Sequence, residues 1–220
     1  LKTFSPYLFT LLSEDMWCRK LSQFGLEKCG ISAALSAFCQ AERAGTFQIF
    51  DVYGKAVTDR DPEKAQVKLL YLAGKAGMPF ALVCPGGGYN RQWTLVEGFP
   101  IAWQLSQMGY HAFILLYRSG KTGLLPEPLE DTAQALQLIA SLSDSCRFTT
   151  RNYAVCGFSA GGNLAALWGT KTQGYARYDA PRPAALLLAY PSVTHEVMFD
   201  AMQTSDDEAW RSGTCQYLAR

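Results

Sequence analysis

The spacing of apolar residues changes character near residue 46 of the chain. Before that point, apolar residues such as Leu8 and Leu12 recur at helical spacing, and the segment from Ile31 to Phe38 repeats the pattern. We expect two or three helices in residues 1–45. Because so short a segment cannot form an independent core, it should pack as an extension on a main domain that covers residues 46–220.

Beyond residue 46, short apolar runs alternate with amphipathic ones. Two strands are expected first, at Phe47–Val52 and Val67–Leu72, joined by a polar turn around residues 59–62. Further strands are expected at Phe80–Cys84, His111–Tyr117, Tyr153–Cys156 and Ala184–Ala189, and helices at Glu97–Met108, Pro128–Leu142 and Asn163–Thr170. Nearly apolar strands separated by amphipathic helices predict an α/β three-layer sandwich with a mainly parallel sheet. In such sheets, ligands bind at the carboxyl ends of the strands.

Composition narrows the classes of partner. Formal net charge is +1, which gives no electrostatic reason to expect nucleic acid or an anionic membrane surface. No apolar run is long enough for a transmembrane helix, and the start of the chain lacks the features of a secretory signal. We therefore expect a cytoplasmic protein that binds neither nucleic acid nor membrane.

The cysteines point the same way. There are seven of them, an odd number, and no pair has C-x-x-C spacing, so neither a disulfide framework nor a zinc site is indicated. Cys84 and Cys156 lie in apolar runs and are expected to be buried thiols in a reducing compartment. No metal is expected.

The sharpest chemical signal is the segment Gly-Phe-Ser-Ala-Gly at residues 157–161, which matches G-x-S-x-G. An apolar strand runs into it and a helix of small residues follows, which is the setting of a nucleophile elbow. Both glycines suit a turn so tight that side chains there would collide with the neighbouring strand and helix. The pattern predicts Ser159 as a nucleophile at a helix N-terminus, with Phe158 in the substrate pocket. The alternative is a glycine-rich turn that happens to contain a serine.

A second glycine-rich corner, Pro-Gly-Gly-Gly-Tyr at residues 85–89, directly follows an apolar strand. Without Cβ atoms, such a backbone can approach a ligand and aim N–H groups at an oxyanion. We expect an oxyanion hole formed by the N–H groups of Gly86 or Gly87 together with that of Ala160, and we place Tyr89 in the substrate pocket. A phosphate-binding loop or a plain turn is the alternative, although neither G-x-G-x-x-G nor the Walker pattern is matched.

The order of these motifs resembles the α/β-hydrolase superfamily, and within it the esterase/lipase branch of acetyl-xylan-esterase-like and other small-ester hydrolases. The resemblance covers about residues 66–192 and includes Glu-Gly-Phe-Pro at 97–100, Tyr117-Arg118 and Pro-Leu-Glu-Asp at 128–131. Where related lipases have histidine before the glycines, this chain has Pro85. The resemblance implies a serine carboxylesterase that cleaves short-chain, acetyl-type esters of small molecules without a cofactor.

The partners of the serine are not evident. The order in this fold is Ser, then Asp or Glu, then His, and the only histidine after Ser159 is His195. We expect that the last strands, the acid and the base are missing from this sequence. His195 could serve as the base instead, although the acids near it, such as Glu196 and Asp200, follow rather than precede it. A zinc-binding H-E-x-x-H pattern fails because position 199 is Phe.

Two earlier residues have structural explanations. His111, at the start of a core strand, is expected to be a core histidine with satisfied hydrogen bonds. Asp131 is expected to be a first-turn acid that the helix dipole favours.

If strands are missing, residues 184–190 become an apolar edge strand without a protecting charge. Such an edge favours pairing between two copies of the chain, so a homo-oligomer stays an open alternative. The exposed edge also supports the expectation that this sequence is incomplete. The alternative functions are a catalytically inactive hydrolase-fold ligand-binding protein, a non-functional fragment that lacks the triad Asp and His, or a peptidase or arylformamidase on the same fold.

Overall fold

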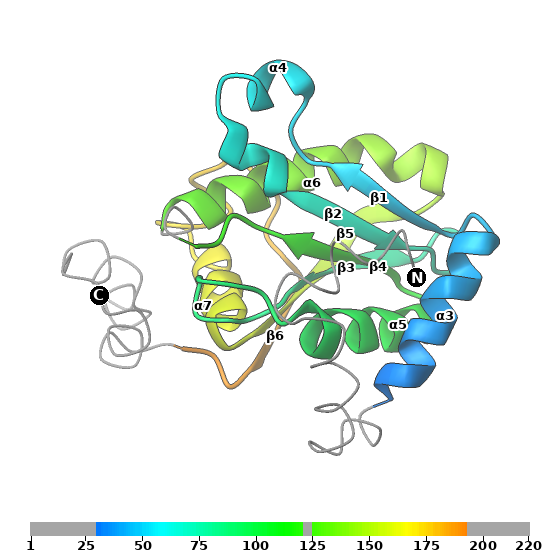
Figure 1. Cartoon of the computed structure of the whole chain (residues 1–220). Coiled ribbons are helices and arrows are strands. Elements are labelled where there is room, and N and C mark those ends of the chain that lie inside the picture. Colours follow the sequence, from blue (N-terminus) through cyan, green and yellow to red (C-terminus); the bar gives the residue numbers. More distant parts are fainter. Residues whose placement is uncertain (1–29, 121–124, 193–220) are drawn as a thin grey trace.

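The computed structural model describes residues 30–120 and 125–192 (Figure 1). A six-stranded sheet has the order β1-β2-β4-β3-β5-β6. Its strands are β1 (Phe47–Asp51), β2 (Lys68–Leu72), β3 (Pro79–Cys84), β4 (His111–Leu116), β5 (Thr149–Phe158) and β6 (Ala185–Ala189). The pairs β4–β3, β3–β5 and β5–β6 are parallel, whereas β2 is antiparallel to both β1 and β4. The predicted mainly parallel sheet is confirmed.

Side chains of the central strands alternate between two hydrophobic cores, one on each face of the sheet. From β3, Phe80 and Leu82 enter the core that contains α6 (Glu127–Cys146) and α7 (Ser159–Trp168). Ala81 and Val83 enter the core that contains α3 (Ile31–Arg43) and α5 (Phe99–Gln107). Helices therefore cover both faces of the sheet (Figure 1), which confirms the three-layer α/β sandwich expected from the sequence.

Helix α3 packs on the main sheet domain. Its Phe38 makes edge-to-face ring contacts with Phe47 of β1 and with Phe99 of α5. The other helices expected in residues 1–45 lie outside the described residues, as do His195 and the segment after it. No helix among residues 30–120 and 125–192 is long and apolar enough to cross a membrane.

The connections differ from the sequence prediction in three places. The expected polar turn between β1 and β2 contains two short helices, α4 (Lys55–Thr58) and the 3₁₀ helix η2 (Pro62–Gln66). The helix expected to begin at Glu97 is preceded by a π-helical turn, η3 (Thr94–Gly98), and α5 starts at Phe99. Helix α7 begins at Ser159 itself, four residues earlier than expected, so the elbow contains no separate loop.

Candidate active site

The strand–helix corner at Ser159 has the geometry of a nucleophile elbow. Ser159 has φ +50°, a left-handed conformation that non-glycine residues rarely adopt. A Cβ atom added to Gly157 would lie 2.2 Å from the Gly161 carbonyl oxygen, and one added to Gly161 would lie 2.0 Å from the Cys84 carbonyl oxygen. Both positions therefore exclude every side chain, which is why the sequence has glycine there. Ser159 is partly exposed at the N-terminus of α7, where the first N–H groups lack helical partners.

The glycine-rich corner after β3 lies against the serine. A Cβ atom added to Gly86 would stand 2.8 Å from the Cβ of Ser159 and 2.4 Å from the Phe158 carbonyl oxygen. Gly87 has φ +136°, and a Cβ there would lie 2.2 Å from the Arg91 carbonyl oxygen. The structure thus brings Gly86, with Gly87 next to it, to the side of Ser159.

Glu97, which sequence reasoning treated only as the opening of a helix, lies at the centre of this region. Its Oε2 accepts the N–H of Gly86 at 2.6 Å, and its Oε1 accepts the hydroxyl of Tyr190 at 2.9 Å. Partial burial and the hydrogen bond to Glu97 raise the pKa of Tyr190 to about 12, so that its hydroxyl stays a donor at neutral pH. The N–H of Gly86 is thus directed at a carboxylate.

Two tyrosines support the glycine loop from inside the protein. Tyr117 donates its hydroxyl to the Pro85 carbonyl oxygen at 2.5 Å, and Tyr89 donates to Oδ1 of Asn163 on α7 at 2.8 Å. Tyr89 is completely buried. The expectation that Tyr89 lines a substrate pocket does not fit this burial, because an aromatic ring in a glycine loop can turn inward as well as outward. Tyr89 instead joins the loop to helix α7.

Two aromatic rings lie near the serine. Phe158, which is partly buried, has its ring centroid 6.0 Å from that of Tyr190, whose side chain is 65% exposed. The N–H of Ser192 donates to the Ser159 carbonyl oxygen at 3.0 Å, so the segment after β6 is attached to the elbow. Phe158 and Tyr190 therefore form an aromatic pair beside Ser159.

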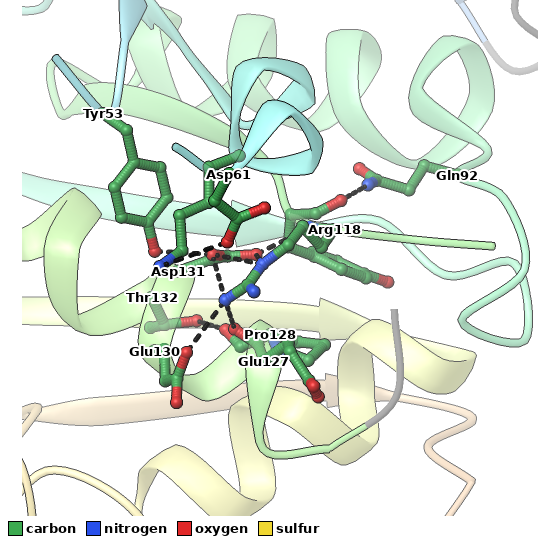
Figure 2. A network of polar contacts seen from close by, with 11 residues as sticks. Tyr53, Asp61, Gln92, Arg118, Glu127, Pro128, Glu130, Asp131 and Thr132 are labelled. Atoms are coloured by element: carbon green, nitrogen blue, oxygen red, sulfur yellow. Dashed lines mark hydrogen bonds and ion pairs between the residues drawn. The ribbon is translucent and has the colours of Figure 1, made fainter. Parts of the chain in front are cut away.

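A buried ion-pair network joins the end of β4 to the start of α6 (Figure 2). Asp131 is fully buried and accepts hydrogen bonds from the Arg118 backbone and guanidinium and from the Tyr53 hydroxyl. Burial tends to lower the pKa of Arg118, but its bonds to Asp131 and Glu130 raise it overall, so the guanidinium stays charged. The expectation of an acid held mainly by the helix dipole is wrong: Asp131 lies beyond the first turn and neutralises Arg118.

His111 is the core histidine that was expected. Its Nδ1 lies 2.8 Å from the Tyr71 hydroxyl and its Nε2 lies 2.9 Å from the Lys75 carbonyl oxygen, and burial lowers its pKa. It begins β4, whereas Ser159 follows the end of β5, a strand of the same direction. His111 therefore lies at the amino ends of the parallel strands, whereas Ser159 lies at their carboxyl ends. His111 cannot act as the base for Ser159.

Cys84 and Cys156 are buried free thiols, as predicted, and burial raises the pKa of both. Within the described part of the chain, no group of three or more His, Cys, Asp or Glu side chains could hold a metal ion.

A cavity of about 310 Å³ lies away from these residues. Its lining includes Thr150 and Tyr153 from the first half of β5 and Phe80 from the start of β3. These residues lie at the amino ends of the parallel strands, whereas Ser159 follows the carboxyl end of β5, so the cavity is separate from Ser159.

A serine on a strand–helix elbow, beside a glycine loop at the carboxyl edge of a mainly parallel sheet, defines an α/β hydrolase. The BD-FAE family model matches residues 70–183, more than half of the chain, and the chain belongs to that family. An acetylxylan esterase of Xylanibacter ruminicola is 27% identical over 134 residues, which are 61% of this chain and 26% of that protein.

Solved structures agree with the family. An acetyl ester-xyloside bifunctional hydrolase from Caldicellulosiruptor lactoaceticus has a TM-score of 0.64 at 26% identity, covering 78% of this chain and 69% of its own. The α/β hydrolase MGS-M1, from a Medee basin deep-sea metagenome library, has a TM-score of 0.56 at 27% identity, covering 67% and 57%. The chain thus spans about a quarter of the curated relative and a little over half of MGS-M1.

Proposed function

We propose that this protein is a serine carboxylesterase that cleaves short-chain, acetyl-type esters of small molecules, with Ser159 as the nucleophile. The observation that carries the proposal is the strained φ of +50° at Ser159, held between two glycines that admit no side chain. Strain of this kind is maintained where a nucleophile must project from the protein. The names of the relatives, an acetylxylan esterase and an acetyl ester-xyloside hydrolase, support acetylated carbohydrates as the substrate class.

In the proposed reaction, the hydroxyl of Ser159 attacks the ester carbonyl carbon while a base takes its proton. The carbonyl oxygen becomes an oxyanion, which the N–H groups of Gly87 and Ala160 would bind, aided by the N-terminal dipole of α7. The alcohol then leaves with a proton, and water hydrolyses the acyl-serine. The base and its acid would come from residues outside the described ones, because Asp131 is occupied by Arg118 and His111 lies at the other edge of the sheet.

A fluorophosphonate probe tests the nucleophile directly. Protein expressed from the complete open reading frame should be labelled at Ser159 and should hydrolyse p-nitrophenyl acetate faster than the octanoate. Ser159→Ala should lose labelling and lower kcat/KM at least about a thousand-fold. Ser141→Ala, on the exposed face of α6, is the matched control and should react like wild type.

Persistent labelling and turnover in Ser159→Ala would exclude this serine. A folded wild-type protein that is neither labelled nor active, but still binds acetylated xylo-oligosaccharides, would favour the inactive ligand-binding protein.

A further inference from the structure

We infer that Glu97 is a positioning residue of the active site, whose carboxylate holds the oxyanion loop in its working conformation. This inference rests on the proposed esterase function. One carboxylate oxygen of Glu97 accepts the N–H of Gly86, which follows β3. The other accepts the hydroxyl of Tyr190, which follows β6. In the sheet, β5 lies between β3 and β6. Glu97 therefore bridges the two segments that flank the strand ending at the nucleophile.

The carboxylate also lies close to the reacting group. The position where Gly86 would carry a Cβ is 2.8 Å from the Cβ of Ser159 and 3.0 Å from Oε2 of Glu97. The side chains of Ser159 and Glu97 thus both lie close to Gly86. A larger residue at position 86 would push both away.

The segment of Glu97 fixes the two peptide groups on either side of Gly86, each through one hydrogen bond. Glu97 holds the N–H of Gly86, and the Trp93 N–H donates to the Gly86 carbonyl oxygen at 2.9 Å. In a trans peptide, the carbonyl and the following N–H point in opposite directions. The N–H of Gly87 is therefore aimed away from Trp93, and no hydrogen bond from it occurs among the described residues. An N–H that is oriented in advance and left unpaired is what an oxyanion hole requires.

The backbone around Glu97 suits this task. Glu97 belongs to the π-helical turn η3, and such turns are rare and often occur at functional sites. Gly98 follows, where a Cβ would lie 3.0 Å from Cγ2 of Thr94 and 3.2 Å from Cγ2 of Ile114. Tight packing around Gly98 holds the π-helical turn against β4, so the backbone that carries the Glu97 side chain is fixed in place.

Glu97 is not placed to be the general base. Each of its oxygens already accepts a hydrogen bond, and Oε2 is occupied by the Gly86 amide, which cannot be released without moving the loop. Its contribution should therefore come from geometry rather than from its charge or its basicity. A glutamine at position 97 keeps an acceptor for Gly86 and a polar group for Tyr190, so the conservative variant separates the two roles.

The experiment compares variants of the protein expressed from the complete open reading frame. Glu97→Ala should lower kcat for p-nitrophenyl acetate on the order of 10- to 100-fold, with KM within about 3-fold of wild type, because misplacing a catalytic donor weakens transition-state binding. Glu97→Gln should stay within about 5-fold of wild type. Tyr190→Phe, at an exposed side chain, should lower kcat by about 2- to 5-fold. Glu63→Ala, at an exposed residue of η2, is the control and should change nothing.

A transition-state mimic separates positioning from general structural damage. The affinity for a trifluoromethyl ketone, which forms a tetrahedral adduct on serine, should fall in Glu97→Ala by about the same factor as kcat, while the thermal midpoint changes little. Unchanged kcat in Glu97→Ala, or equal losses in the Gln and Ala variants, would overturn the inference. If Glu97→Ala does not fold, Tyr190→Phe still decides, since full activity there contradicts the bridge.

The two proposals fail in different ways. Absence of Ser159-dependent hydrolysis in wild type removes the esterase and, with it, the role of Glu97. Ser159-dependent hydrolysis that survives in full in Glu97→Ala removes only the role of Glu97.

Discussion

At the scale of single residues, Gly161 shows how closely the elbow is packed. A methyl group at this position would overlap the carbonyl oxygens of Cys84 and Pro85, at 2.0 and 2.5 Å, and backbone atoms cannot yield as a flexible side chain can. We predict that Gly161→Ala lowers the free energy of unfolding by about 3 kcal/mol or more, or prevents folding. Gly54→Ala is the control, because Gly54 has φ −71° and nothing within 4 Å of the added Cβ. Urea unfolding measures both variants, and equal midpoints would contradict the packing argument.

Residue roles could be predicted where the reason for them is local. The strand–helix corner at Ser159 and the glycines beside it follow from the demands of one tight turn, so the sequence alone predicts this corner. Glu97 could not be found in this way, because its partners, Gly86 and Tyr190, come from distant segments that only the sheet order brings together. The prediction that Tyr89 lines a substrate pocket did not fit for a related reason. The ring of Tyr89 turns inward to bond Asn163, on a helix far along the chain.

At the scale of elements, apolar runs predicted all six described strands, because the strands of a mainly parallel sheet consist largely of continuous apolar side chains. Helix starts were less predictable. The π-helical turn before α5 and the start of α7 at Ser159 depend on contacts with the glycine loop, which carry no periodic signal in the sequence. The same holds for the attachment of α6 to the end of β4 through the pair Arg118 and Asp131, which the apolar face of the helix does not reveal (Figure 2).

The Arg118–Asp131 pair yields a test of how α6 is attached to β4. Asp131 is fully buried and the Arg118 side chain is 6% exposed, so Asp131→Ala would leave a buried guanidinium without its main partner. We predict a loss of about 3–5 kcal/mol in the free energy of unfolding, measured in urea. Asp59→Ala removes the exposed pair with Lys55, whose side chains are 85% and 60% exposed, and should cost less than about 1 kcal/mol. Similar losses in the two variants would show that the buried network does not stabilise the fold.

At the scale of the whole molecule, the sheet is well covered on both faces at its centre and poorly covered at β6. Among the described strands, β6 pairs only with β5, and Leu186, Leu187 and Leu188 are 39%, 51% and 40% exposed. The apolar run at residues 184–190 carries no charge, so nothing on this strand repels a further strand. The candidate site lies at the carboxyl ends of the parallel strands, and the described cavity lies at their amino ends. The site and the cavity can therefore be altered independently.

The two sides of β6 differ, and this difference leads to a prediction about association. Leu186 packs towards α7, since a Cβ on Gly169 would lie 2.4 Å from its Cδ1, whereas Leu187 is on the opposite face and is the more exposed. We predict that Leu187→Lys, in the chain of residues 1–220, reduces light scattering and the fraction of oligomer in size-exclusion chromatography, because a charge on an edge strand opposes pairing with a second edge. Its thermal midpoint should stay close to that of the parent. Leu186→Lys is the matched variant, and it should lower the midpoint because it introduces a charge beside α7. Unchanged association in Leu187→Lys would mean that β6 is not the surface through which copies of the chain meet.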